Sequence, residues 1–211
     1  MGWQQLIDSG VHTIVSLETR GLPAEDAARA NLPLSPPTGS DLDVVGLPVE
    51  DGSDEKFMGR WARTGLWATP LYFADALQRW PSLIGRAVTT IVSAPPMVLM
   101  HCSRGHDRTG LTAVVILHFA GVTLDGMVAD YLLSAHSLTV DDPTSQTFLD
   151  EALAGADVTA HQAIGGAVDV IDDAWRRRAG VTDATVAALR HRMVGPRRPA
   201  RTSPAGRQPL Q

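Results

Sequence analysis

The sequence predicts an α/β fold in which a small central, mostly parallel sheet is flanked by helices and the C-terminal half is helical. Three short runs of β-branched and aliphatic residues predict the strands, at residues 13–17, 43–49 and 97–101. Two helical patterns separate the second run from the third, and only helical patterns follow the third. A strand, a helix and a strand in succession indicate a βαβ crossover, which joins parallel strands.

Turn residues bound each predicted strand. The first run follows a Ser-Gly turn, the second ends before Asp51, and the third starts after two prolines and stops at Cys102. The runs are almost continuously apolar rather than alternating, which is typical of parallel strands buried on both faces. We therefore expect both faces of the sheet to be covered.

Helical periodicity and end signals predict the helices. The connection at residues 21–40 is rich in proline and includes one helical turn near residues 24–30. Thr123 and Thr182 are expected to cap helices, and Gly121 to end one. The remaining predicted helices span residues 69–80, 82–93, 110–120, 123–135, 143–154, 160–179 and 182–193.

The length and composition predict a single domain. A chain of 211 residues with 44% hydrophobic residues can bury one core, which we place at residues 1–194. Residues 195–211 hold four arginines, four prolines and no acid, a composition typical of a disordered basic tail. The net charge of −5 argues against general nucleic-acid binding. The oligomeric state is left open.

The lengths of the apolar stretches and the single cysteine indicate the cellular compartment in which the protein is expected. The longest stretches, residues 88–92 and 97–100, are far shorter than the roughly 20 residues that span a bilayer, and no secretory signal is visible. One cysteine forms no internal disulfide, which fits a reducing compartment, and it excludes a cysteine-rich zinc module. We expect a cytoplasmic protein with no membrane span.

Residues 101–110, His-Cys-Ser-Arg-Gly-His-Asp-Arg-Thr-Gly, combine a nucleophile with an anion-binding loop. Backbone N–H groups from Ser103 to Arg108 can form a nest for a phosphate dianion, and the following helix adds the positive end of its dipole. The same field favours the thiolate of Cys102. Arg108 offers a planar fork that matches two phosphate oxygens.

The other loop residues have supporting roles in this interpretation. Gly105 permits a sharp turn close to the ligand, and Gly110 lets the helix start pack closely. Thr109 is expected to hydrogen-bond the cysteine sulfur, and His101 to buttress the loop. Arg104 either contacts the substrate or is solvated, and these two alternatives stay open.

This residue set predicts two displacements at phosphorus. Cys102 attacks and forms a phosphocysteine, an acid protonates the leaving oxygen, and water then hydrolyses the intermediate. The reaction needs no metal and no cofactor. The expected substrate is a phosphorylated protein or a small phosphomonoester.

The loop resembles the signature of the protein tyrosine phosphatase superfamily, which is His-Cys, five residues, Arg, then Ser or Thr. Residues 105–110 are most similar to the bacterial and fungal branch with a Gly-Lys-Asp-Arg-Thr-Gly loop, which includes dual-specificity and phosphoinositide-active members. Residues 10–17, 47–51, 128–134 and 181–193 also resemble segments of that branch. The resemblance implies a cysteine-phosphatase-like fold and a protein tyrosine phosphatase activity.

The chain departs from that branch at two points. His106 stands where the branch usually has lysine, a permanent charge on the loop rim, and histidine is charged only part of the time near neutrality. We therefore expect His106 to select against multiply charged head groups and to favour phosphotyrosine. The chain also begins close to its first strand, without the branch's Asn-Phe-Arg-Asp-like strand, so we expect a lost peripheral strand or a start placed too late.

Two aspartates compete for the role of general acid. Asp107 precedes Arg108 within the loop, and members of the branch have an acid there. Asp51 follows the second strand, where the wider superfamily has a mobile acid loop, and Gly52 beside it is a candidate hinge. The sequence favours Asp107, although Asp51 as acid or as a simple turn residue stays open.

Several alternatives remain beside this prediction. The loop also fits a phosphoinositide phosphatase, a phosphate-recognition module without turnover, and a persulfide-carrying or arsenate-reducing thiol enzyme. Thr109 after the arginine and the lack of a second cysteine argue against the last of these. Trp61, Trp67, Trp80 and Trp175 are expected to be packing residues rather than substrate platforms.

Overall fold

The structure is a computed structural model, and it describes residues 2–19, 22–30 and 36–194. Within these ranges, three strands form one sheet in the order β2-β1-β3. Both pairs are parallel, with Thr13 opposite Asp43 on one side and Val98 on the other. The strands are β1 (Thr13–Ser16), β2 (Asp43–Gly46) and β3 (Val98–His101). The predicted α/β class with a parallel sheet is confirmed, and the predicted disordered tail lies outside the described residues.

Burial differs between the central and the edge strands. All four residues of β1 are buried, as expected for a strand covered on both faces. Residues in β2 and β3 are partly exposed, and Leu99 in β3 is 36% exposed. The prediction that all three strands are buried is therefore wrong for β2 and β3, because β1 takes the central position and leaves each of them one sheet neighbour within the described chain.

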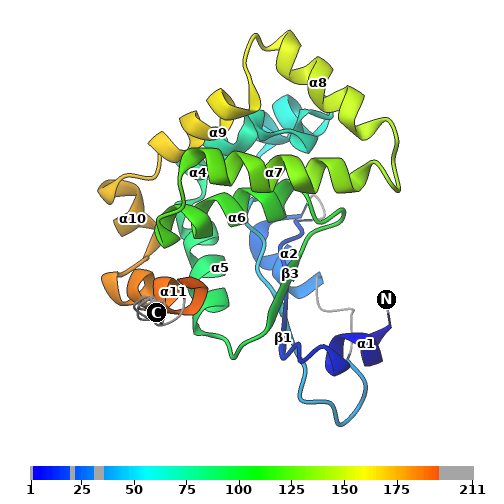
Figure 1. Cartoon of the computed structure of the whole chain (residues 1–211), viewed down its shortest axis with the longest axis vertical. Coiled ribbons are helices and arrows are strands. Elements are labelled where there is room, and N and C mark those ends of the chain that lie inside the picture. The colour runs from blue at the N-terminus through cyan, green and yellow to red at the C-terminus, as the bar shows by residue number, and fades with distance from the viewer. Residues whose placement is uncertain (1, 20–21, 31–35, 195–211) are drawn as a thin grey trace, which may run out of the picture.

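Helices make up most of the described chain (Figure 1). Those before β3 are α1 (Trp3–Asp8), α2 (Ala24–Ala30), α3 (Glu55–Phe57), α4 (Phe73–Arg79) and α5 (Pro81–Ser93). Those after β3 are α6 (Asp107–Ala120), α7 (Leu124–Leu138), α8 (Ser145–Gly155), α9 (Ala160–Asp169), α10 (Asp173–Ala179) and α11 (Asp183–Val194). A π-helical turn spans Met58–Ala62, and 3-10 turns span Leu66–Ala68 and Pro70–Tyr72.

The predicted helices after the second strand are largely confirmed, with one correction. The hydroxyl of Thr123 accepts from Gly126 N and caps α7, and the hydroxyl of Thr182 accepts from Thr185 N before α11. The single helix predicted over residues 160–179 is wrong, because the chain breaks between α9 and α10. Asp172 starts the new helix by accepting a hydrogen bond from Trp175 N at 2.6 Å, an N-cap that competes with helix continuation. The short helices α1 and α3 were not predicted.

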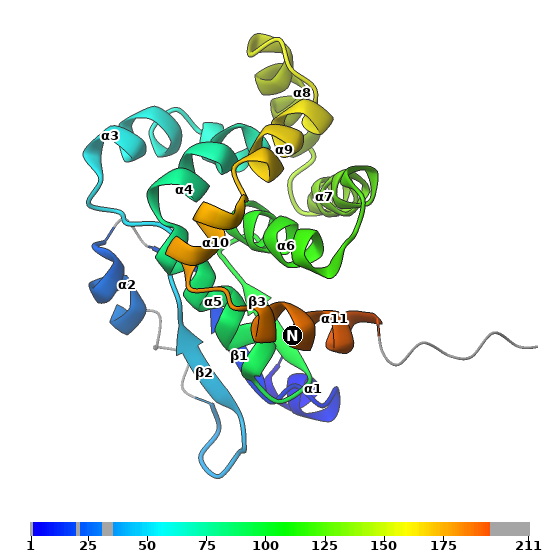
Figure 2. The ribbon, with the colours of Figure 1, turned by 90° about the vertical axis from the view of Figure 1, so that its left-hand side faces the viewer.

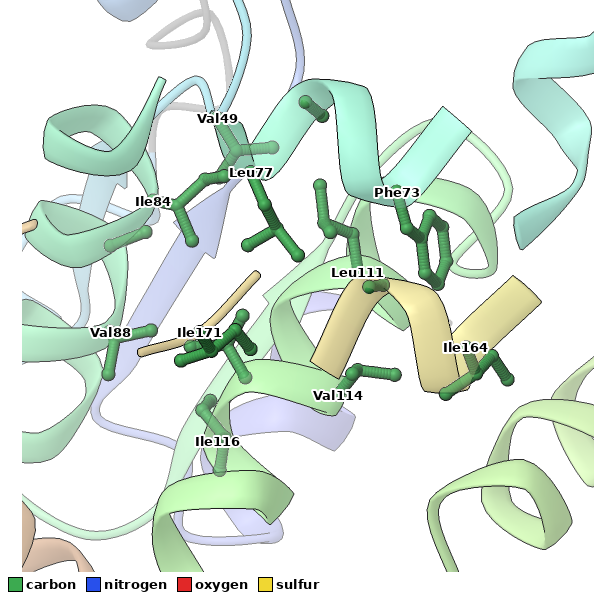
Figure 3. Close-up of a cluster of buried hydrophobic side chains, with 14 of the residues drawn as sticks. Val49, Phe73, Leu77, Ile84, Val88, Leu111, Val114, Ile116, Ile164 and Ile171 are labelled. Atoms are coloured by element: carbon green, nitrogen blue, oxygen red, sulfur yellow. The ribbon is translucent and has the colours of Figure 1, made fainter. Parts of the chain in front are cut away.

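The helices fix the sheet and the loop after β3. In Figure 2, α2 lies on the β2 side of the molecule and α11 on the opposite side. α2 packs so closely on β2 that a Cβ at Gly46 would lie 2.2 Å from the carbonyl oxygen of Ala28. Figure 3 shows Leu77, Ile84 and Leu111, from α4, α5 and α6, meeting in one fully buried cluster. This packing holds the start of α6 in place, and with it the loop that carries Cys102.

Candidate active site

The loop from His101 to Gly110 joins β3 to α6, so the sheet and the helix fix its two ends (Figure 1). Cys102 comes directly after β3 and is only 5% exposed. α6 begins at Asp107, three residues earlier than predicted. The first N–H groups of a helix have no partner inside the helix, and together with its dipole they attract an anion. Cys102 is therefore held beside an anion-binding helix start.

Contacts inside the loop restrict its shape. The ring Nδ1 of His101 lies 3.1 Å from the carbonyl oxygen of Cys102, and since a carbonyl only accepts, Nδ1 carries the proton and donates. Gly105 has φ +71°, a conformation that side chains disfavour. A Cβ at Gly110 would lie 3.2 Å from the ring of Tyr131, so glycine allows α6 to approach α7. These contacts agree with the buttressing, turning and packing roles expected of the three residues.

Arg108 is held by two residues that the sequence did not single out. Its Nε lies 3.4 Å from Oε2 of Glu50, and its guanidinium carbon lies 4.2 Å from the ring centre of Trp67. The Nε1–H of Trp67 donates to Oε1 of Glu50 at 2.9 Å. Trp67 thus supports the arginine directly by stacking and indirectly through the carboxylate. Trp67 is a half-buried packing residue, as expected, and its contact with Arg108 is the part that the sequence did not indicate, whereas Trp61 and Trp175 are buried in the core.

Glu50 is completely buried beneath the arginine. Burial raises the pKa of Glu50 to about 7, although attraction to Arg108 and the hydrogen bond from Trp67 oppose the rise. A buried carboxylate is stable only when it is paired, and Arg108 is the cation beside it. Glu50 therefore restrains the guanidinium of Arg108.

We expect Trp67→Phe to lower kcat/KM for a phosphate ester about tenfold and Trp67→Ala about 100-fold. Phenylalanine keeps a ring beneath Arg108 but removes the donor to Glu50, and a hydrogen bond to a charged group contributes about 1.5–3 kcal/mol. Alanine also removes the cation–π contact, which adds about 0.5–2 kcal/mol. Steady-state kinetics check this, with the partly buried Trp80→Phe as control. Equal losses in Trp80→Phe and Trp67→Phe would contradict a specific role for Trp67.

Asp107 and Asp51 differ in what surrounds their carboxylates. Oδ1 of Asp107 is buried without a hydrogen-bond partner, and burial raises its pKa to about 6 against the attraction of Arg108 and Arg104. Asp51 lies in a turn, where its Oδ1 accepts from the N–H and the hydroxyl of Ser53 at 2.9 and 2.6 Å. The structure thus gives Asp107 a largely buried carboxyl group with a raised pKa, and gives Asp51 the contacts of a turn residue.

His106 lies inside the protein and not on the rim of the loop. It is 3% exposed, and its two ring nitrogens each lie 3.0 Å from a hydroxyl, those of Ser134 and Tyr131 on α7. Burial and, to a smaller extent, the charge of Arg104 lower the pKa of His106 to about 4. The prediction that His106 is a partly charged rim residue is therefore wrong. The position of His106 in the loop sequence did not indicate that residues of α7 contact its ring.

We expect the stability of the fold to depend on His106 between pH 4 and pH 6.5. Its pKa is about 4 when folded and near 6.5 in an unfolded chain, so in this window the unfolded chain binds more protons. Stability gained from His106 is therefore present above pH 6.5 and is lost as the pH falls toward 4, by up to about 3 kcal/mol.

Urea unfolding at several pH values checks this prediction. Glu50 and Asp107 have raised pKa values and change stability in the opposite direction over the same range, so the measured quantity is the difference between wild type and His106→Gln. His136→Gln, at an exposed position of α7, is the matched control. A pH-independent difference between wild type and His106→Gln would contradict the neutral, buried state of His106.

Three more loop residues were expected to bind phosphate or the cysteine sulfur. Ser103 and Arg104 are exposed, and Arg104 forms an ion pair of 2.8 Å with Asp142 in the connection between α7 and α8. The hydroxyl of Thr109 is buried with no hydrogen-bond partner, so the expected bond to the sulfur is absent from this structure. Arg104 is thus an exposed residue that pairs with an acid of the protein, and its contact with a substrate stays a prediction.

A cavity of about 320 Å³ lies beside the loop. Arg104, His106 and Asp107 of the loop form one wall, and residues of α7, α8 and the turn near Gly65 form the others.

Among the described residues, no group of three or more histidine, cysteine or acidic side chains is arranged to hold a metal ion. In the same part of the chain, no helix has both the length and the apolar character to cross a membrane.

Comparison with known proteins agrees with this geometry. A family model described as the tyrosine phosphatase family matches residues 1–196. The chain is 29% identical to the triple specificity protein phosphatase PtpB of Mycobacterium tuberculosis (strain ATCC 25618 / H37Rv) over 71% of its own length and 64% of that protein's. It is 35% identical to a tyrosine-protein phosphatase of Nostoc commune over 46% of its own length and 31% of that protein's. The matches therefore cover less than two thirds of either relative.

Proposed function

The chain belongs to the tyrosine phosphatase family, and from that premise we propose that it is a cysteine-dependent phosphomonoester hydrolase that acts on phosphotyrosine. The observation that carries the proposal is the joint position of Cys102, Arg108 and Asp107 around the start of α6. A buried thiol, a held guanidinium and a protonated carboxyl group are the three groups that phosphate-ester cleavage needs.

In the first step, the thiolate of Cys102 attacks phosphorus and the bond to the leaving oxygen breaks. The backbone N–H groups at the start of α6 and the guanidinium of Arg108 bind the phosphoryl oxygens as their charge increases. Glu50 and Trp67 keep the guanidinium in place, so little reorganisation is needed during the reaction. The product of this step is a phosphocysteine.

Asp107 supplies the proton that the leaving oxygen takes up. Its raised pKa keeps a useful fraction of the carboxyl group protonated near pH 6, and Asp107 lines the cavity beside the loop. In the second step, a water molecule attacks the phosphocysteine while the now ionised Asp107 accepts a proton from it. Inorganic phosphate leaves and the thiolate is restored.

Two features of the site support phosphotyrosine over phosphoinositide head groups. Among the described residues of the wall beside Asp107, His106 is neutral and Arg104 is already paired with Asp142. A head group with several phosphates would need unpaired cations there. The rest of the cavity is lined mainly by apolar side chains, including Leu138 and Phe148, which offer no partner to the further phosphates of a head group.

Phosphate release from a substrate panel tests the proposal. We expect the wild type to hydrolyse p-nitrophenyl phosphate and phosphotyrosine peptides in the presence of a metal chelator, and Cys102→Ser to hydrolyse neither. Phosphoserine peptides and phosphoinositides belong in the same panel, because one relative is named a triple specificity phosphatase. A wild type that releases no phosphate from any of these compounds between pH 4 and pH 8 would overturn the proposal in favour of a phosphate-recognition module.

A further inference from the structure

The cavity beside the loop extends away from the reacting groups toward α7 and α8. These two helices lie next to each other at the top of Figure 1, above the loop that precedes α6. Ala135 and Leu138 of α7 form one side of the cavity, and Phe148 and Leu149 of α8 form the other. The cavity therefore has an apolar part on α7 and α8, beside a polar part that includes Asp107 and residues of the α7–α8 connection.

Two contacts connect α8 and its approach to the rest of the site. The ion pair between Arg104 and Asp142 ties the α7–α8 connection to the loop. The ring of Phe148 lies 3.4 Å from where a Cβ of Gly65 would be, so the turn before Leu66–Ala68 closes the cavity from below. A side chain at position 65 would fill this end of the space, and glycine leaves it open.

The charges at the cavity wall are already compensated by the protein. Arg104 is neutralised by Asp142, and both ring nitrogens of His106 contact hydroxyls of α7. Among the buried side-chain polar atoms of the described cavity-lining residues, Oδ1 of Asp107 has no hydrogen-bond partner, and the proposed mechanism uses this carboxyl group. Among the described residues that line the cavity, the charged pair is thus Arg104 with Asp142, and burial of an apolar group against Leu138 and Phe148 is favourable.

The volume limits what the cavity can hold. At about 320 Å³, it lies at the small end of ligand pockets, which span about 300–1,000 Å³. This space suits one bulky side chain, and it does not suit an extended peptide. Because Asp107 must contact the leaving oxygen, the phosphorylated residue lies at the mouth of the cavity. A neighbouring group of the same substrate can then enter the cavity itself.

We propose that this cavity is a subsite that selects phosphotyrosine peptides with a large aliphatic or aromatic residue close to the phosphotyrosine. The inference rests on the proposed function and adds a sequence preference to it. Phe148 supplies the largest apolar surface of the subsite and determines the preference. The cation-poor wall makes the same subsite unfavourable for acidic neighbours, which would be desolvated without a partner.

Binding to Cys102→Ser tests this subsite independently of turnover. The probes are phosphotyrosine peptides in which each of the three positions on either side is alanine, leucine, phenylalanine or glutamate. We expect leucine or phenylalanine at one position to bind about tenfold more tightly than alanine, and glutamate to bind no better than alanine. In Cys102→Ser/Phe148→Ala, the ratio of the leucine to the alanine dissociation constant should return to about one.

The matched control is Leu132→Ala, which shortens an exposed apolar side chain of α7 outside the cavity. The control should keep the tenfold preference. Equal binding of all peptides, a preference that survives Phe148→Ala, or tighter binding of inositol polyphosphates than of the leucine peptide would overturn the subsite. Turnover of p-nitrophenyl phosphate by the wild type is measured separately, so loss of the subsite and loss of the proposed activity give different results.

Discussion

Cys102→Ser should lower kcat for phosphate-ester hydrolysis by a factor of about 10⁴ or more, the largest effect expected of any single change. Removal of a catalytic nucleophile costs about 10⁴–10⁶ in comparable covalent mechanisms. A serine hydroxyl at this position is a much weaker nucleophile than a cysteine sulfur. Rate measurements with p-nitrophenyl phosphate and with a phosphotyrosine peptide check the loss.

The same variant should keep its fold and its affinity for anions. Serine is close to cysteine in size, and the amides and Arg108 that form the cradle are unchanged. Orthophosphate should therefore raise the thermal unfolding temperature of Cys102→Ser as much as that of the wild type. Turnover within tenfold of the wild type would contradict a nucleophilic role for Cys102.

Asp107→Asn should lower kcat for a phosphotyrosine peptide by a factor of about 10²–10³ near pH 6, the range typical of a lost general acid. For p-nitrophenyl phosphate the loss should be smaller, because nitrophenolate leaves without a proton. Asp51→Asn should change either rate less than threefold, since Asp51 bonds to Ser53 within its own turn. A large loss in Asp51→Asn with none in Asp107→Asn would assign the acid to the other residue.

The pH dependence gives a second readout of the same assignment. The pKa of Asp107 is raised to about 6 by burial, and the acid must be protonated in the first step. In the wild type, kcat/KM should therefore fall as the pH rises through about 6. In Asp107→Asn this descending limb should disappear, and a limb that persists unchanged would contradict Asp107 as the acid.

The local patterns of the sequence predicted the fold well where neighbours along the chain decide the structure. The runs at 13–17, 43–49 and 97–101 became the three strands, and Thr123 and Thr182 cap helices as expected. The strand-loop-helix unit around Cys102 was also predicted, because a nucleophile, an arginine and two glycines at this spacing are what binding and attack of a phosphate ester need. The helix break at Asp172 was missed, since its capping bond is one of several conformations that the local sequence allows.

Contacts between distant segments account for the rest. Glu50, Trp67 and Arg108 come from three separate parts of the chain, and no periodicity indicates that they meet. The role predicted for His106 was wrong for the same reason. Its ring contacts Tyr131 and Ser134 of α7, which are distant from it in the sequence. A tryptophan at a helical turn and a glutamate after a strand have many ordinary roles, and only their tertiary contacts distinguish them here.

The central claim is that hydrolysis proceeds through a phosphocysteine on Cys102, and rapid-quench mass spectrometry tests it most directly. The wild type is mixed with excess p-nitrophenyl phosphate near pH 6, quenched within milliseconds in acid and digested, and the peptide that contains Cys102 is analysed. We predict that this peptide carries one phosphoryl group during turnover, and that the group is absent in Cys102→Ser. Turnover without phosphate on Cys102, or with phosphate on another residue, would contradict the claim.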